Sequence, residues 1–134
     1  MRVSARRRPY VWTLAVVLVL VLLVGCAGSG SSYEGANTSW IHRLTLGDKL
    51  AQQGQWGDAY DAYISIYVEA SNTRPPSEYA NYHALFLGYL RHLCSGILAR
   101  KNGDMANFDV ELPKAEELQN AAYTELERVR SGAK

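Results

Sequence analysis

The sequence has little of the chemistry that catalytic and metal sites need. Its 134 residues include two cysteines and three histidines. His83 and His92 are nine positions apart, on opposite sides of a helix, so they cannot hold one ion together. There is no glycine-rich phosphate loop, no nucleophile motif and no metal-ligand spacing, and the acidic residues are scattered. We therefore expect no metal, no cofactor and no enzyme activity.

A strong net charge and alternating apolar runs are also missing. The chain carries 14 Lys and Arg against 13 Asp and Glu. Four of the arginines lie in residues 1–25, so the remainder has a formal charge of 10 − 13 = −3. A mildly acidic domain lacks the basic surface that nucleic acids attract, so we expect no nucleic-acid partner. Because no convincing period of two is present, we expect an all-α fold.

The first 25 residues have the layout of a secretory signal. Arginines gather in residues 2–8, and the uncharged run 10–24 is rich in valine and leucine. That run is shorter than the roughly 20 apolar residues that a spanning helix needs. Small residues follow it at once, where a cleavage site is expected.

The end of this segment resembles the lipobox of bacterial lipoproteins, in the residues Leu23-Val24-Gly25-Cys26. The resemblance implies that residues 1–25 are a signal peptide, that Cys26 carries covalent lipid (diacylglyceryl and palmitate), and that the protein is held in the cell envelope. In that family an aspartate after the cysteine favours the inner membrane. Ala27 in this place implies the outer membrane, if the organism has one, with the domain in the periplasm or cell envelope and the leaflet left open. The alternative is an uncleaved signal anchor in which Cys26 has no role.

Residues 26–38 are predicted to be the lipidated cysteine and a flexible tether, because glycine, serine and small polar residues dominate them. We expect Asn37, Thr38 and Ser39 to cap the first helix. A helical domain is predicted for residues 39–131, with apolar residues three and four apart. About four helices, arranged as two antiparallel hairpins, are expected at 40–54, 56–70, 77–101 and 113–129. Pro113 is expected at the first position of the last helix, after a loop.

One part of the domain resembles a tetratricopeptide repeat. The residues with its spacing are Leu46, Gly47, Leu50, Gly54, Trp56, Ala59 and Tyr63. The resemblance implies two antiparallel helices that small residues bring together and aromatic rings hold at a fixed angle. Two positions depart from the family pattern, since Arg43 stands where tryptophan is usual and Ile66 replaces an alanine. An ordinary helical hairpin is the alternative interpretation.

The aromatic residues suggest two functions. Trp56, Tyr60, Tyr63, Tyr67, Tyr82 and Tyr89 are candidate binding residues on the second and third helices. Core packing is the first interpretation of these rings, and we expect His83 and Cys94 to be buried with them. One hypothesis is a lipid-anchored interaction module that binds another protein or a second copy. The other is a helical bundle that binds a small ligand in a tyrosine-lined pocket.

Overall fold

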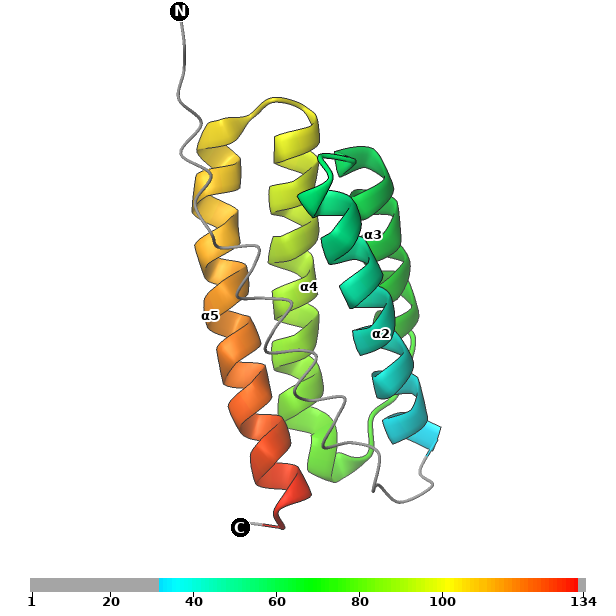
Figure 1. Cartoon of the computed structure of the whole chain (residues 1–134). Helices are drawn as coiled ribbons and strands as arrows, with labels where there is room; N and C mark the ends of the chain where they lie inside the picture. Colours follow the sequence, from blue (N-terminus) through cyan, green and yellow to red (C-terminus); the bar gives the residue numbers. More distant parts are fainter. Residues whose placement is uncertain (1–31, 133–134) are drawn as a thin grey trace, which may run out of the picture.

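The computed structural model describes residues 32–132 as a small all-α bundle. Four long helices follow one another along the chain, and no strand occurs in this part of it (Figure 1). They are α2 (Ser32–Gln52), α3 (Trp56–Ser71), α4 (Ala80–Lys101) and α5 (Met105–Arg130), with one 3₁₀ turn, η1 (Ser77–Tyr79), before α4. The prediction of an all-α fold with four helices in two hairpins is confirmed.

Both hairpins turn at a glycine with the same backbone geometry. Gly54 follows α2 with φ of 75°, and Gly103 follows α4 with φ of 76°, which is the left-handed region that glycine adopts without strain. The residue after each glycine donates its N–H back into the helix, from Gln55 to Leu50 at 2.9 Å and from Asp104 to Ala99 at 2.8 Å. Both bonds satisfy carbonyls that a helix end leaves open. The two turns lie at the same end of the bundle, which we call the far end (Figure 1).

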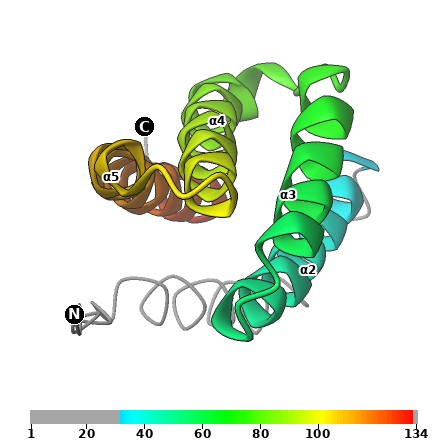
Figure 2. The same cartoon turned by 90° about the horizontal axis from the view of Figure 1, so that it is seen from above.

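The central helix is α4, which packs on a neighbour from each hairpin. The view along the bundle shows α5 on one side of α4, and α3 with α2 behind it on the other (Figure 2). Glycines bring α5 close, because a Cβ added at Gly96 would lie 3.4 Å from the Cβ of Glu111. The apolar side of α4 is wider than one stripe and includes Phe86, Leu90 and Leu93.

In the α2–α3 hairpin, Gly47 of α2 packs directly against the ring of Tyr63 of α3. A Cβ added at Gly47 would lie 2.6 Å from Cε1 of Tyr63, so only glycine fits against that ring. Tyr63 is 1 % exposed and its hydroxyl donates to the Asp48 carboxylate. This is the close approach of a small residue and a large ring that the sequence pattern predicts for this hairpin.

Side chains, rather than close backbones, join α2 to α4. Within residues 32–132 no Cα of α2 lies within 8 Å of a Cα of α4 or α5. Trp40, which is 0 % exposed, fills the space and stacks on Phe86 with ring centroids 5.9 Å apart. Tyr33 meets Trp40 edge-on at 5.9 Å, and Tyr33 Oη lies 2.8 Å from Nδ1 of His83. The first helix is therefore attached to the central one through aromatic residues.

The start of the domain differs from the sequence prediction. Helix α2 begins at Ser32, so residues 32–38 are helical rather than part of a flexible tether. Asn37 does not cap the helix: it lies inside α2, is buried, and accepts a 2.6 Å hydrogen bond from Tyr82. Thr38 donates back to the Glu34 carbonyl in the same helix. Residues 26–31, with Cys26, and the signal and lipobox at 1–25 lie outside the described residues.

The start of the last helix also differs. The loop expected before Pro113 is helical, because α5 begins at Met105, where the Asp104 side chain accepts the N–H of Asn107 at 3.1 Å. Pro113 does not begin α5: it lies several residues inside the helix, on its exposed side. An exposed proline leaves the carbonyl that its missing N–H would have bonded open to water. No helix in residues 32–132 is long and apolar enough to cross a membrane.

Candidate functional site

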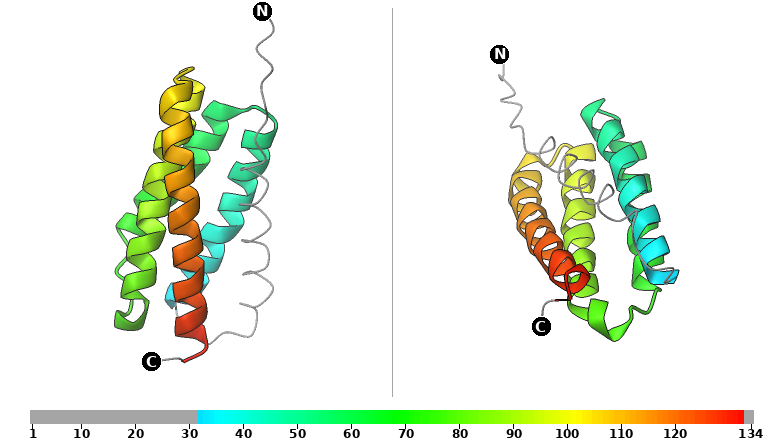
Figure 3. Two further views of the ribbon diagram at one scale, coloured as in Figure 1. Left: turned by 90° about the vertical axis from the view of Figure 1, so that its left-hand side faces the viewer. Right: turned by 60° about the horizontal axis from the view of Figure 1, so that its bottom comes forward.

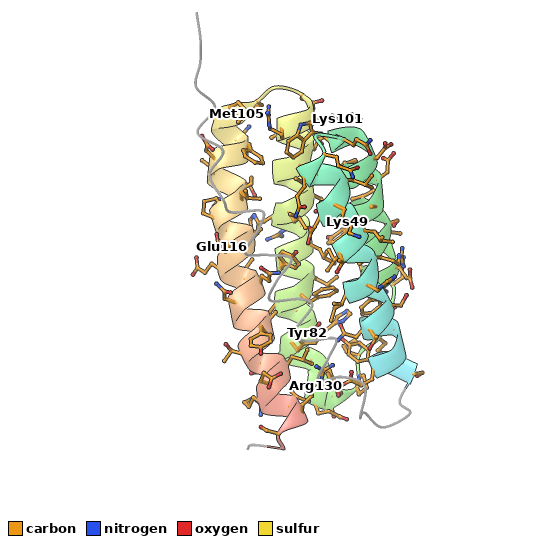
Figure 4. All side chains as sticks on the ribbon, in the orientation of Figure 1. Lys49, Tyr82, Lys101, Met105, Glu116 and Arg130 are labelled. Atoms are coloured by element: carbon orange, nitrogen blue, oxygen red, sulfur yellow. The ribbon has the colours of Figure 1, made fainter. Side chains whose placement is uncertain are left out.

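The six predicted binding residues divide into two groups. Tyr63, Tyr82 and Tyr89 are between 1 and 3 % exposed, so they are interior side chains, in agreement with the core-packing interpretation. Trp56, Tyr60 and Tyr67 are partly exposed and pack on the edge of the core. Figure 4 shows Tyr82 among the side chains of the bundle toward the end where α4 begins. A binding role for the six stays a prediction.

The interior of the bundle contains polar groups beside its rings. Cys94 is buried, and burial raises the pKa of its thiol to about 12, which makes it a poor nucleophile. Burial also lowers the pKa of His83, so this imidazole is held neutral and can accept the Tyr33 hydroxyl. Both residues are core residues, as predicted. In residues 32–132 no three His, Cys, Asp or Glu side chains are placed to share a metal ion.

An ion pair joins the two ends of the described chain. Glu34, in the first turn of α2, accepts from Arg130, in the last turn of α5, with Oε2 and Nη2 3.0 Å apart. Tyr79 donates to the same carboxylate. Burial raises the pKa of Glu34, but the hydrogen bonds from Arg130 and Tyr79 outweigh it, so its pKa is below the ordinary value. Figure 3 shows the starts of α2 and α4 and the end of α5 gathered at one end, which we call the near end.

The far end carries a group of side chains from three helices. The guanidinium of Arg100, at the end of α4, lies 5.0 Å from the ring centroid of Trp56, the first residue of α3. Phe108 of α5 meets the same ring edge-on at 6.3 Å, and Arg100 donates to the Met105 sulfur at 3.3 Å. We call these four residues, Trp56, Arg100, Met105 and Phe108, the far-end patch; Figure 4 labels Met105 there, with Lys101 beside it.

The far-end patch has the composition of a protein interface. Met105 is 41 % exposed, and Trp56, Arg100 and Phe108 are partly exposed. Aromatic residues, methionine and arginine are enriched at the centres of protein–protein interfaces. Of the four, the sequence identified Trp56 alone, because residues 104–112 were expected to be a loop. The overlooked signal was Asp104 as a helix cap, followed by apolar residues at Phe108, Leu112 and Ala115.

One exposed stripe of α3 is polar. Asp61, Ser65 and Glu69 are exposed, and Arg43 of α2 binds both Glu69 and Ser65. The residue that departs from the tetratricopeptide pattern therefore has its own partners. An exposed pair of this kind adds about 0–1 kcal/mol to stability.

Comparison of the chain with protein-family models, with curated proteins and with solved structures found no match. The tetratricopeptide resemblance therefore depends on the residue spacing from Leu46 to Tyr63.

Proposed function

We propose that the protein is a lipid-anchored envelope protein whose helical domain binds another protein through the far-end patch. The observation that carries this proposal is the group formed by the exposed Met105 and the partly exposed Trp56, Arg100 and Phe108, which three helices bring together although they are up to 52 positions apart in the sequence. Surface apolar groups on a monomer often mark an interaction site when they are contiguous.

The position of the proposed anchor supports an orientation in which the far-end patch points away from the membrane. Cys26 is separated from Ser32 by residues 27–31, a stretch that spans at most about 20 Å when fully extended. The near end is therefore held beside the bilayer. Helix α4, with 22 residues, is about 33 Å long, so the far end is beyond the reach of the tether.

This geometry favours a different protein as the partner of the far-end patch, rather than a second copy of this chain or the membrane. Two copies that stand upright on short tethers in one leaflet turn their far ends the same way, which works against end-to-end contact between their patches. The membrane is at the opposite end. The partner that fits is a protein surface with apolar side chains and a carboxylate, because Arg100 lies at the centre of the patch and Lys101 lies beside it.

The tyrosine-lined ligand pocket has less support. Tyr63, Tyr82 and Tyr89 have their rings covered, and the hydroxyls of Tyr63 and Tyr82 are bound to Asp48 and Asn37. A ligand would have to displace packed side chains to reach them.

The anchor is tested by replacing Cys26 with serine. Wild-type protein made in bacteria with labelled palmitate is expected to take up the label, because the acyl chains are attached at this residue. Cys26→Ser is expected to remove the label, and Cys94→Ser, at the only other cysteine, is expected to keep it. Absence of label in the wild type, or its persistence in Cys26→Ser, would contradict the anchor.

The binding surface is tested by Met105→Glu. Adding a charge to an exposed apolar residue should cost little stability, but should reduce the yield of the partner crosslinked in intact cells at least about 10-fold, as loss of an interface hot spot does. The matched control is Val68→Glu: Val68 is 52 % exposed and lies near the end of α3, away from the patch.

Crosslinks to one protein that depend on Met105 and not on Val68 support the proposal. Three outcomes contradict it: no reproducible partner, an equal loss in both variants, or crosslinks to a second copy of this chain.

A further inference from the structure

The carboxyl group of Asp48 is buried in the core and has no positively charged side chain as an ion-pair partner within residues 32–132. Asp48 is 1 % exposed. Its Oδ1 accepts the hydroxyl of Tyr63, while its Oδ2 is buried and has no hydrogen-bond partner. None of the ion pairs in residues 32–132 includes it. A carboxylate in such a place keeps one strong hydrogen bond and loses the rest of its hydration.

The groups that face Asp48 are neutral. Tyr63 faces it from α3, and Tyr89 and Cys94 lie beside this pair on α4. Burial raises the pKa of both phenols and of the thiol, so none supplies or carries charge at ordinary pH. The Tyr89 hydroxyl is itself buried without a partner. Protonation of Asp48 removes the uncompensated charge from the core.

We propose that the protonation state of Asp48 controls how stably α2 packs on α3 and α4. Protonation stabilises this packing, and loss of the proton weakens it. The position of Asp48 makes this control effective, because Asp48 follows Gly47, where α2 packs so closely on the Tyr63 ring that an added Cβ would clash with it. The free energy of this contact then depends on the pH around the protein. This inference stands whether or not the far-end patch binds a partner.

The direction of the effect follows from the two states of the acid. Burial raises the pKa of Asp48 to about 6, against the opposing hydrogen bond from Tyr63, whereas the unfolded chain has the ordinary value of 3.8. The extra stability is therefore complete below pH 3.8 and is lost as pH rises through about 6. Glu34 has the opposite sign, since its pKa is lowered, and its contribution is lost below about pH 4.5. His83 also opposes Asp48, because burial disfavours its charged form, so protonation of the unfolded histidine below 6.5 lowers the stability of the folded state.

The test compares the full chain in detergent with Asp48→Asn from pH 4.5 to 7.5, so that Glu34 and His83 contribute equally to both proteins. The readout is hydrogen exchange of the α2 and α3 amides, corrected for the intrinsic exchange rate. At pH 7.5 the variant is expected to show about 10- to 100-fold greater protection than the wild type, because the amide cannot ionise. At pH 4.5, where the buried acid is protonated but the unfolded one is still largely ionised, the difference is expected to fall to less than about 10-fold.

A second measurement keeps the proposal testable if asparagine does not fit. The infrared band of a protonated carboxyl in the wild-type chain should appear as pH falls through about 6. Tyr63→Phe removes the hydrogen bond that favours the charged form, so it should move this transition to higher pH. An infrared titration near pH 4, or the same pH profile of protection in wild type and Asp48→Asn, would overturn the proposal.

Discussion

Replacement of Trp40 by alanine is expected to lower the free energy of unfolding by about 3–5 kcal/mol, which is the range for removal of a fully buried large ring. Trp40 is 0 % exposed and contacts Tyr33, His83 and Phe86. Since every Cα of α2 is more than 8 Å from every Cα of α4, loss of this ring leaves a space that no close backbone contact between the two helices fills. Urea denaturation of the detergent-solubilised chain, followed by circular dichroism, measures the loss.

Trp56→Ala is the matched control for this prediction. It removes the same side chain from a partly exposed position, where the ring contacts Phe108 and Arg100 at the bundle end. We expect a loss of about 1–2 kcal/mol, because less apolar area is returned to water. If Trp40→Ala were no more harmful than Trp56→Ala, the aromatic connection between α2 and α4 would not be the main support of the first helix.

Gly47→Val is expected to lower the free energy of unfolding by about 3 kcal/mol, at the upper end of the usual cost of overpacking a core. Even the first added carbon would lie 2.6 Å from Cε1 and 3.1 Å from Cζ of Tyr63. That ring cannot move aside freely, because it is 1 % exposed and its hydroxyl is bonded to Asp48. The clash therefore outweighs the few tenths of a kcal/mol that valine gains over glycine in a helix. The same urea denaturation measures it.

Gly35→Val provides the control in the same helix. Gly35 is exposed, and an added Cβ there would meet nothing within 4 Å. We expect a change within about 0.5 kcal/mol, in favour of valine. Equal losses at Gly35 and Gly47 would mean that β-branching, rather than the Tyr63 ring, explains the effect.

The hairpins could be predicted because their signals are local. A glycine that must adopt positive φ stands after α2 and after α4, and two prolines separate α3 from η1. The apolar residues of α3 and α4 recur three and four positions apart, and the structure buries them. The predicted bounds of α3 differ from the observed bounds by one residue.

The start of α2 could not be predicted from composition alone. Glycine, serine and asparagine dominate residues 27–38 and are typical of a linker. The helical state of residues 32–38 depends on distant partners: Tyr33 contacts His83, Asn37 accepts from Tyr82, and Glu34 binds Arg130, at separations of 45 to 96 positions. Such tertiary contacts override weak local preference and cannot be read from spacing within one segment.

The predicted start of the last helix at Pro113 was wrong for the opposite reason. A strong local preference, that of proline for the first turn of a helix, was applied to a proline that lies further along. Proline favours the first turn of a helix, but it is tolerated on an exposed face further along. The actual start is set by Asp104, which follows the turn glycine and accepts from Asn107. Because the first turns of α5 were missed, Met105 and Phe108 were missed as part of the far-end patch. Trp56 was found because it lies within the hairpin spacing.

The ion pair between Glu34 and Arg130 also determines how the domain bears mechanical load. Under the proposed arrangement, a moving partner pulls at the far end, and the tether resists at Ser32. Because Arg130 connects the first turn of α2 to the last turn of α5, tension at Ser32 is shared between two helices and runs along their axes. Helices loaded lengthwise must slide past one another before they separate, whereas a helix held at one end alone can be peeled away turn by turn. The Glu34–Arg130 pair would thus add to the contacts of Tyr33 and Trp40 in opposing the peeling of α2.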